Sequence, residues 1–300
     1  FVECNATRAV CGFRESSSHR IVDVQRCVVL EPAIDDARGT IASWVSGSTG
    51  RGEALIQPGK QERPAIYLRW FGKLVPEVFS RAERSVAKGE WAGVAVLMEG
   101  ASKPAVIGDA RGETMGVDGM PFTTSAGGFM QAFGEMNRTL VDTAVGYARG
   151  DGEKVLELFS GAGNLTVSLA GKTAFLETVE SDSAAVEAAR ENLKQRGLQA
   201  RLRVSDANQA KPSKDTRVVV LDPPRTGAAE ACRGIVDSSV RRVVMVSCDP
   251  STLGRDLEIL VQGGFEVERV DAFEMFPQTS HIESVVLLTR GQARGRKTIG

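Results

Sequence analysis

The amino-acid sequence predicts an α/β protein in two parts: a mostly parallel, doubly wound sheet, preceded by a smaller, mainly antiparallel β domain of the α+β type. Three observations support this fold class. Helical and strand patterns alternate after about residue 125, as expected of β–α–β units. The segments Arg217–Leu221 and Arg242–Ser247 are continuously apolar, which is typical of strands buried on both faces. Before residue 125, short apolar stretches alternate with clusters of Gly, Ser and Asp, which indicates antiparallel strands.

These observations divide the chain into three regions. We expect residues 1–125 to form a β-rich domain truncated at its start, residues 126–290 to form the doubly wound domain, and residues 291–300 to be a flexible basic tail. Within the first region one helix is expected, over about Val75–Lys88. Because the chain starts at Phe1, without an initiator Met or a signal peptide, we interpret it as a fragment of a longer protein.

The second domain is predicted element by element from the spacing of its apolar residues. Amphipathic helices are indicated over residues 137–149, 184–196 and 252–262, and a further helix starts at 165. The pair Gly263-Gly264 ends the last of these helices. Short apolar runs indicate strands at residues 154–159, 173–179, 217–221, 242–247 and 285–289.

Composition and charge place the chain among ordinary globular proteins. It has 300 residues, of which 42% are hydrophobic and 25% charged, and its formal net charge is −1. This balance neither supports nor excludes a nucleic-acid partner. No apolar run reaches the roughly 18 residues of a membrane span. The five cysteines include no Cys-x-x-Cys pair, which argues against a self-contained zinc site and favours a reducing cytoplasm. We expect a cytoplasmic monomer.

A glycine-containing turn between a predicted strand and a predicted helix is the first candidate binding site. Gly161 and Gly163 allow a tight backbone turn that can approach a ligand closely. Thr166 stands where a dinucleotide-binding motif would have its third glycine. The acidic Glu157 at the end of the preceding strand suits a cationic ligand better than a pyrophosphate. These residues favour S-adenosylmethionine over a dinucleotide.

Two acidic residues follow the next two strands. Glu180 comes 19 residues after Gly161, where a carboxylate can accept hydrogen bonds from both hydroxyls of a ribose. A solvated carboxylate at a strand end remains an alternative interpretation of Glu180. Asp206 could meet an adenine amino group, but a lone Asp in a loop is more often a cap or turn former.

Two further strand ends carry residues that suit covalent catalysis. Asp222 ends a buried strand and is followed by Pro223, Pro224 and Arg225, which hold the exit of the strand in an extended path. Cys248 ends the next apolar strand. Because ligands bind beyond the carboxyl ends of strands in open α/β sheets, both residues should face one crevice. An inert buried cysteine is the alternative when Cys248 is considered alone.

A possible general base precedes the last strand. Glu283 lies at the same predicted rim, whereas the nearby His281 is more often a structural residue in such a position. One cysteine and one base are the minimum set for methylating carbon 5 of uracil. In that reaction the thiolate adds to carbon 6, carbon 5 attacks the methyl group, and the base removes the proton from carbon 5.

With these motifs the chain resembles the bacterial RNA (uracil-5-)-methyltransferases. Besides the glycine motif, it matches their Asp-Pro-Pro-Arg-x-Gly at Asp222–Gly227 and their Ser-Cys-x-Pro-x-Thr-Leu-x-Arg-Asp at Ser247–Asp256. It also matches their Met-Phe-Pro-x-Thr-x-His-x-Glu at Met275–Glu283. The resemblance covers about residues 125–290 and implies a Rossmann-like methyltransferase domain that uses S-adenosyl-L-methionine.

The resemblance also implies roles for individual residues. It makes Cys248 the nucleophile, Glu283 the base, and Asp222 and Arg225 substrate contacts. Cofactor contacts are implied for six positions: Gln131, Phe159, Gly161, Gly163, Glu180 and Asp222. Phe133 replaces an Asn of the family's Phe-x-Gln-x-Asn motif, so the usual contact of that Asn is absent.

The ribosomal-RNA branch of the family also carries a [4Fe-4S] cluster held by four cysteines. Cys27, in Ile21–Cys27, resembles the fourth of these ligands, and the other three would lie upstream of Phe1. This resemblance favours ribosomal over transfer RNA as the partner, and 23S rRNA in particular. We expect Cys27 to be a free thiol in this chain and the metal site to be incomplete.

Three other functions are less consistent with these motifs. An amine methyltransferase would need neither Cys248 nor Glu283. An RNA cytosine-5 methyltransferase would carry a second cysteine where Pro224 stands. A non-catalytic RNA-binding protein of the same fold would not need these motifs intact. A transfer-RNA uridine methyltransferase remains the main alternative for the substrate.

Overall fold

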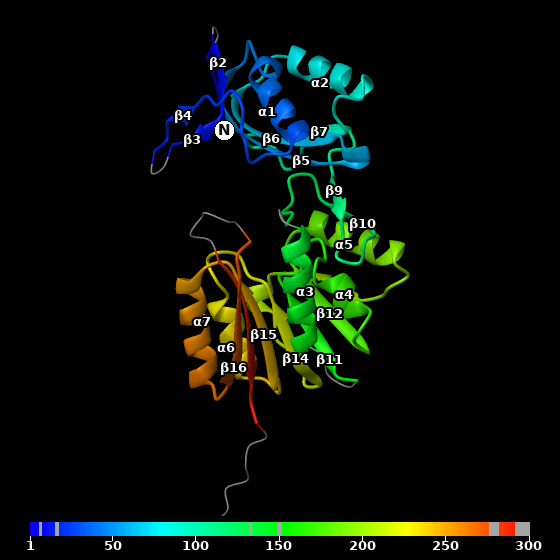
Figure 1. The fold of residues 1–300 in the computed structure, drawn as a ribbon, viewed down its shortest axis with the longest axis vertical. Helices are drawn as coiled ribbons and strands as arrows, with labels where there is room; N and C mark the ends of the chain where they lie inside the picture. Colours follow the sequence, from blue (N-terminus) through cyan, green and yellow to red (C-terminus); the bar gives the residue numbers. More distant parts are fainter. Residues whose placement is uncertain (6–7, 16–17, 132–133, 149–151, 276–281, 292–300) are drawn as a thin grey trace, which may run out of the picture. The chain divides into compact units, whose positions relative to one another are not determined.

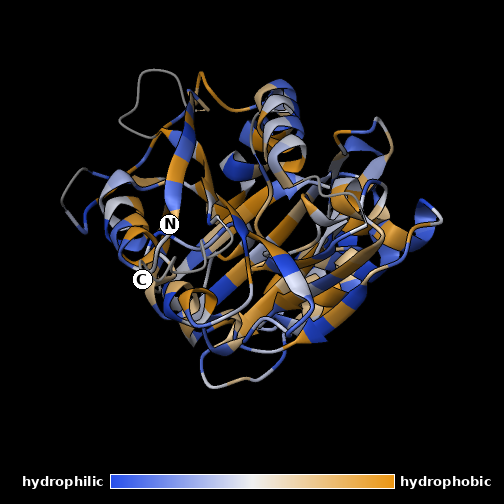
Figure 2. Cartoon of the chain, turned by 90° about the horizontal axis from the view of Figure 1, so that it is seen from below, coloured by the Kyte–Doolittle hydropathy of each residue, from blue (hydrophilic) through white to orange (hydrophobic). Residues whose placement is uncertain are grey.

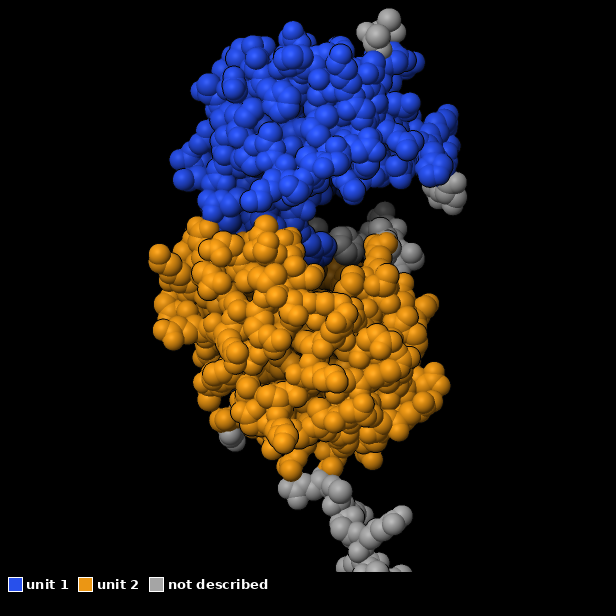
Figure 3. All heavy atoms as spheres, turned by 180° about the vertical axis from the view of Figure 1, so that it is seen from behind, with its two compact units in different colours: residues 1–114, 122–130 blue, residues 115–121, 131–300 orange. Residues whose placement is uncertain are grey.

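The computed structural model describes residues 1–5, 8–15, 18–131, 134–148, 152–275 and 282–291. The chain forms two compact units, shown in Figure 3. The first unit contains Phe1–Thr114 and Phe122–Met130, and the second contains Met115–Pro121 and Gln131–Gly300. The sequence placed the division at residue 125, and the structure groups residues 115–121, which precede it, with the second unit.

The first unit is built on a six-stranded sheet of order β2-β1-β5-β6-β7-β8, of which β2, β5, β6 and β7 are labelled in Figure 1. Neighbouring strands are antiparallel except β6 and β7, which are parallel. The strands of this sheet are β1 (Val2–Asn5), β2 (Arg8–Cys11), β5 (Thr49–Pro58), β6 (Pro64–Lys73), β7 (Gly93–Met98) and β8 (Ala105–Gly108). Smaller elements are β3 (Phe13–Arg14) with β4 (Ile21–Val22), β9 (Gly112–Met115) with β10 (Pro121–Thr124), and the 3₁₀ turn η1 (Lys60–Glu62).

The first unit contains two α-helices where the sequence predicted one. Helix α2 (Glu77–Ala87) matches the expected helix, whereas α1 (Pro32–Trp44) was not predicted. Helix α1 buries Ile34, Ala37 and Ile41, which have helical spacing, and its Pro32 suits a first turn. The sequence signal was weak because a charged residue, Arg38, lies on the buried face. Both helices contribute to one hydrophobic core on the sheet.

The second unit confirms the predicted doubly wound α/β fold. Its seven-stranded sheet has the order β13-β12-β11-β14-β15-β17-β16. The first five strands in this order are parallel, and β17 is antiparallel to both of its neighbours. The strands are β11 (Lys154–Leu158), β12 (Phe175–Glu180), β13 (Arg201–Val204), β14 (Thr216–Leu221), β15 (Arg242–Ser247), β16 (Glu266–Phe273) and β17 (Glu283–Thr289).

Helices cover both faces of this sheet. They are α3 (Gly134–Ala148), α4 (Thr166–Ala170), α5 (Ser183–Gln195), α6 (Ala229–Val236) and α7 (Pro250–Gln262), with the 3₁₀ turn η2 (Ala207–Gln209). Leu221 of β14 packs in one core with residues of α6 and α7, and its neighbour Val220 packs in another with residues of α3 and α4. This alternation follows from the pleat of a strand. Figure 2 accordingly shows the interior strands as mostly hydrophobic and the helices as mixed.

Strand β16 is an addition to the predicted elements. Most of its residues are exposed, because it forms the outer edge of the sheet and pairs only with β17. Its alternating charged and apolar residues have no buried face that a hydrophobic pattern could reveal. The strands at the centre of the sheet were predicted because they are buried on both sides.

Candidate active site

The carboxyl ends of the parallel strands lie together at one edge of the sheet in the second unit. Leu158, the last residue of β11, pairs with Val179 of β12 and with Leu221 of β14. The antiparallel strand β17 runs the other way, and its Ser284 pairs with Ser247 at the end of β15. The residues that follow β11, β12, β14 and β15 therefore lie at the same edge as the start of β17. This edge is the one that the sequence predicted to carry the site.

The register of β15 and β17 places Cys248 close to Glu283. The last pair of the ladder joins Ser247 to Ser284; Cys248 directly follows Ser247, and Glu283 directly precedes Ser284 as the first residue of β17. Opposite residues in an antiparallel pair have Cα atoms about 4.5–5.5 Å apart. The two residues are thus neighbours in space although they are far apart in the sequence. Their side chains interact electrostatically, since the Glu283 charge raises the pKa of the thiol.

The thiol of Cys248 is half-buried among charged groups. Its pKa is raised mainly by burial, and the carboxylates of Glu283 and Asp222 raise it further, whereas the guanidinium of Arg225 lowers it. A raised thiol pKa means that Cys248 is protonated at neutral pH in this state of the protein. Because the thiolate is the reactive form, Arg225 is the neighbour that favours reactivity.

The two carboxyl groups beside Cys248 also have raised pKa values. Burial raises the pKa of Asp222 to about 7, and the negative charge of Glu283 contributes. Glu283 is only 7% exposed, and burial raises its pKa while Arg225 opposes the shift. Raised carboxyl pKa values bring proton exchange closer to neutral pH, which suits a general acid or base.

The glycine turn has the conformation that its sequence requires. Gly161 and Gly163 have positive φ values of 52° and 95°, and a Cβ added at Gly161 would meet nothing within 4 Å. Phe159 also has a positive φ, of 61°, which is unusual for a bulky residue and indicates a strained position. Strain of this kind is often found where backbone is held against a ligand.

Three asparagines that the sequence pattern did not reveal hold this turn. The side chains of Asn137 and Asn164 exchange two hydrogen bonds of 3.0 and 2.9 Å. Asn192 donates to the carbonyl of Ala162 at 3.0 Å. Asn137 and Asn192 are buried polar residues within otherwise apolar helix faces, which is the signal that could have identified them.

Glu180 is an ordered part of the same turn. Its Oε2 accepts a hydrogen bond from the backbone N–H of Gly161 at 3.0 Å, and its Oε1 accepts one from the N–H of Asp182 at 2.8 Å. Each carboxylate oxygen retains lone pairs for further donors. The backbone of the turn thus orients this carboxylate, and its role toward a ribose stays a prediction. Asp206 instead accepts from the N–H of Asn208 at 2.9 Å and caps η2, so the capping interpretation of this residue is confirmed.

Glu157 is a buried carboxyl group beneath the turn. It is 1% exposed, and its Oε2 has no hydrogen-bond partner among the described residues. Burial raises its pKa to about 8, with smaller contributions from the negative charges of Asp222 and Glu180. Glu157 is consequently neutral at pH 7 in this state, although the sequence suggested a charged residue.

Gln131 and Cys27 are not joined to these residues by any described contact. The Oε1 atom of Gln131 is buried without a partner among the described residues. Cys27 belongs to the first unit, and its backbone N–H donates to Asp35 at 3.1 Å. His281, Phe133 and residues 292–300 of the predicted tail lie outside the described residues.

Two absences apply to the described part of the chain. No group of three or more His, Cys, Asp or Glu side chains there is arranged to hold a metal ion. No helix there is long and apolar enough to span a membrane.

The fold and the residues at this edge define a methyltransferase domain of the Rossmann-like class. A family model described as Methyltransferase small domain matches residues 137–243, and one described as tRNA (Uracil-5-)-methyltransferase matches residues 201–291. The second match includes Asp222, Cys248 and Glu283. The chain belongs to the RNA (uracil-5-)-methyltransferase family.

Curated relatives support this assignment. The chain is 33% identical to the 23S rRNA (uracil(1939)-C(5))-methyltransferase RlmD of Chromohalobacter salexigens, over 99% of the chain and 65% of the relative. It is 32% identical to the protein of the same name from Klebsiella pneumoniae, over 93% of the chain and 66% of the relative. The chain thus spans about two thirds of the length of these relatives.

A solved structure has a similar fold. The tRNA (uracil-54, C5)-methyltransferase of Pyrococcus abyssi, determined with S-adenosyl-L-homocysteine, superposes with a TM-score of 0.74 at 20% identity. The match covers 96% of this chain and 74% of the other. At this level of identity the likeness extends to the fold alone.

Proposed function

We propose that this protein transfers a methyl group from S-adenosyl-L-methionine to carbon 5 of a uridine in RNA, with 23S rRNA as the substrate. The proposal depends above all on one observation: Cys248 and Glu283 flank the last pair of the β15–β17 ladder, and Cys248 interacts electrostatically with Glu283, Asp222 and Arg225. A nucleophile and a base at one strand edge are the minimum set for this reaction. The curated relatives named as 23S rRNA methyltransferases support the choice of ribosomal RNA.

The residues around the glycine turn fit S-adenosylmethionine. Gly161 leaves open space above the turn, and buried oxygens of Gln131, Glu157 and Ser160 lack partners among the described residues. Glu180 would accept hydrogen bonds from the ribose, while Phe159 and Gly163 would line the same site. A nearby sulfonium would also lower the pKa of Glu157 and favour its charged form. When bound, S-adenosylmethionine supplies an electrophilic methyl group.

The protein's own residues would do the remaining chemistry. The thiolate of Cys248 attacks carbon 6 of uracil, a sulfur–carbon bond forms, and the electron pair of the 5,6 double bond becomes available at carbon 5 as an enolate. After carbon 5 has gained its methyl group, Glu283 removes the proton from that carbon. The sulfur–carbon bond then breaks, the double bond re-forms, and Cys248 leaves as a thiolate. Asp222 and Arg225 would hold the base during these steps.

The ionisation states of the two groups set a condition for this reaction. The Cys248 thiol must lose its proton before attack, and Glu283 must be ionised to take the proton from carbon 5. Both groups have raised pKa values, so we expect activity to increase as the pH rises through neutrality.

The test uses RNA that contains 5-fluorouridine. Fluorine at carbon 5 cannot be removed as a proton, so the methylated adduct should accumulate on Cys248 and survive denaturing electrophoresis. Cys248→Ala should form no adduct, and Cys232→Ala, which changes a fully buried cysteine of α6, should form it normally. Glu283→Gln should accumulate adduct on ordinary RNA.

The choice of RNA is tested in the same assay. Adduct on 23S rRNA but not on tRNA supports the ribosomal substrate, and the reverse supports the transfer-RNA alternative. An adduct in the Cys248→Ala variant, or RNA binding with neither adduct nor methylation, would contradict the proposed chemistry. A cytoplasmic monomer is proposed with this function.

A further inference from the structure

The first turns of helix α7 bind the backbone of the Asp-Pro-Pro-Arg loop. Asp256 is 1% exposed, and its Oδ2 accepts a hydrogen bond from the N–H of Ala228 at 2.6 Å. Its Oδ1 accepts two hydrogen bonds from Arg255, at 2.7 and 2.9 Å. Arg255 in turn donates to the carbonyl of Thr226 at 2.9 Å. An adjacent pair of charged residues thus satisfies two backbone groups of one turn, 28 residues away from Asp256.

The turn can close on this pair only because its central residue is glycine. Gly227 has a φ of 75°, and its N–H donates to the carbonyl of Pro224 at 2.8 Å. A Cβ at this position would lie 2.3 Å from Nη2 of Arg255 and 2.6 Å from Oδ2 of Asp256. The carboxylate is therefore packed against backbone, and the backbone path from residue 224 to 228 is fixed by it.

That backbone path sets the position of the Arg225 Cα atom, from which its side chain extends. The Arg225 side chain is exposed, and it forms no salt bridge with a described residue. Its charge nevertheless lowers the pKa values of Cys248, Glu283 and Asp249, which follow β15, open β17 and cap α7. The backbone position of residue 225 sets how close this charge can lie to the three elements.

We propose that Asp256 is a positioning residue, which acts through the turn at residues 226–228 to hold Arg225 beside Cys248 and so sets the reactivity of the thiol. The inference rests on the proposed function, which explains why the reactivity of Cys248 matters. Its test, however, needs neither RNA nor a methyl donor. Burial and the carboxylates of Glu283 and Asp222 suppress ionisation of Cys248, and Arg225 is the positive charge that opposes them. If the turn loosens, the carboxylates act unopposed and the thiol becomes harder to ionise.

The direction of the shift in the Cys248 pKa distinguishes a positioning role of Asp256 from a direct effect of its charge. Removing the negative charge of Asp256 would by itself favour a thiolate, and so lower the pKa of Cys248. Loss of the Arg225 position must instead raise it. An upward shift on removing a carboxylate therefore has the sign that displacement of Arg225 predicts, and not the sign of the lost charge.

The experiment measures alkylation of Cys248 by iodoacetamide as a function of pH, with the modified peptide quantified by mass spectrometry. A Cys27→Ser background removes the other half-buried thiol, since Cys4, Cys11 and Cys232 are buried. Asp256→Ala should move the alkylation midpoint upward by at least about half a pH unit. Arg225→Ala should shift it equally, and the double variant should shift it no further. Asp256→Asn, whose amide oxygen can still accept from Ala228, should restore part of the parent profile.

A second variant keeps the proposal testable if Asp256→Ala does not fold. Gly227→Ala changes no charge but strains the turn at its positive φ, and it should give the same upward shift. Thermal unfolding identifies the folded variants. A parent-like profile in folded Asp256→Ala or Gly227→Ala, or additive shifts in the double variant, would overturn the proposal. If the shift is found but the parent protein does not methylate RNA, the proposed function fails and the positioning role stands.

Discussion

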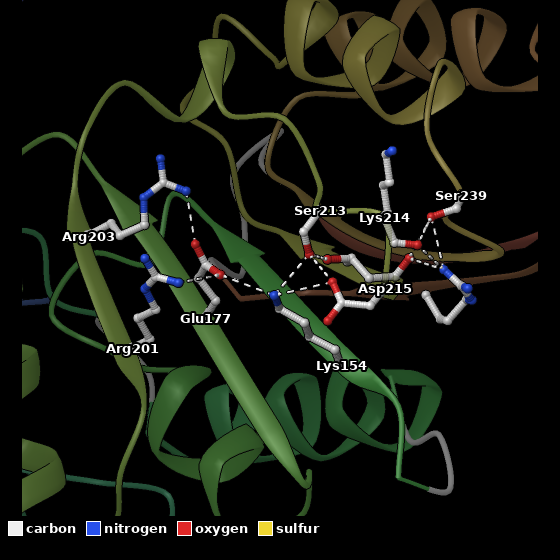
Figure 4. Close-up of polar contacts among 10 residues, drawn as sticks. Lys154, Glu177, Arg201, Arg203, Ser213, Lys214, Asp215 and Ser239 are labelled. Carbon is white, nitrogen blue, oxygen red and sulfur yellow. Dashed lines mark hydrogen bonds and ion pairs between the residues drawn. The ribbon is translucent and has the colours of Figure 1, made fainter.

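Buried carboxyl groups on the two sides of the sheet's strand ends in the second unit differ in whether they have cationic partners. On the amino-end side, Glu177, the third residue of β12, is 6% exposed and accepts a hydrogen bond from Arg203 at 2.9 Å. It also forms an ion pair with Lys154 at 3.6 Å (Figure 4). At the edge where the parallel strands have their carboxyl ends and β17 begins, Glu157 and Glu283 are similarly buried, but neither forms a salt bridge with a described residue.

The paired carboxylate is part of a wider network. Lys154 donates to Ser213 at 2.9 Å and lies 3.5 Å from Asp215, and Arg201 approaches Glu177 to 3.9 Å (Figure 4). Each buried charge there has an opposite charge within reach, which offsets the free energy lost on leaving water. At the other end Glu157 and Asp222, with pKa values raised to about 8 and about 7, avoid part of that loss by holding protons near neutral pH.

This difference indicates that the paired carboxylate contributes to stability, whereas the unpaired carboxyl groups are suited to chemistry. A carboxylate with fixed cationic partners contributes to folding and has little freedom to exchange a proton. A carboxyl group left without such partners costs stability when ionised, but it can take up and release protons near neutral pH. Natural proteins keep such unfavourable groups mainly at functional sites. The same substitution, Glu to Gln, should therefore have opposite effects at the two ends.

The largest expected effect comes from that substitution at Glu283. Glu283→Gln should lower the rate of product formation by about 10²–10⁴-fold, the usual contribution of a general base. The free energy of unfolding should stay constant or increase, because the change removes a charge that is buried without a fixed partner. Turnover is measured with labelled S-adenosylmethionine, and stability by urea unfolding.

The matched control is Glu177→Gln at the other end. It should leave turnover within about threefold and lower the free energy of unfolding by about 1–3 kcal/mol, because charge-assisted hydrogen bonds are lost. The comparison between the two ends fails if both variants lose stability alike, or if Glu177→Gln abolishes turnover.

The sequence allowed the second unit to be predicted better than the first. Strands such as Arg242–Ser247 are buried on both faces, so their apolar runs are continuous and easily recognised. Helix α1 was missed because its buried face includes Arg38, a charged residue that donates to the carbonyls of Val24 and Gln25. A search for periodic apolar residues does not detect a face that includes a buried arginine.

The candidate site shows the same limit. Strand ends could be predicted, so the positions of Asp222, Cys248 and Glu283 at one edge followed from the topology. The protonation state of Glu157 could not be predicted, because its raised pKa depends on how completely the fold excludes water from the carboxyl group. The hydrogen bond from the Ala228 N–H to the Asp256 carboxylate could not be predicted either, because it joins a backbone group to a side chain 28 positions away.

The next largest expected effect is on the pH dependence of stability, through Glu157. The pKa of this carboxyl group is about 8 in the folded protein, against 4.5 for an ordinary glutamate, so the folded state binds the extra proton between these values. The contribution of this group to stability should therefore be full below about pH 4.5, and fall as the pH rises toward 8 and above. Glu157→Gln should remove this fall and stabilise the protein at pH 9 by a few kcal/mol, since one pKa unit corresponds to about 1.4 kcal/mol.

Chemical unfolding at several pH values tests this prediction. The difference in free energy of unfolding between Glu157→Gln and the parent should grow from about pH 6 to pH 9. A constant difference would mean that Glu157 is already ionised in the folded protein. In that case the contrast between the two ends of the sheet would rest on Asp222 and Glu283 alone.

The smallest expected effect separates the two arginines that meet Glu177. Arg203 donates to Glu177 at 2.9 Å and its side chain is 40% exposed, whereas Arg201 lies 3.9 Å away with 65% exposed. Exposed ion pairs contribute roughly 0–1 kcal/mol, so Arg203→Ala should cost about 1 kcal/mol and Arg201→Ala about half of that or less. Raising the salt concentration should shrink both effects, because exposed charges are screened. Equal losses would show that Glu177 is stabilised by the summed positive charge around it, and not by the one well-formed hydrogen bond.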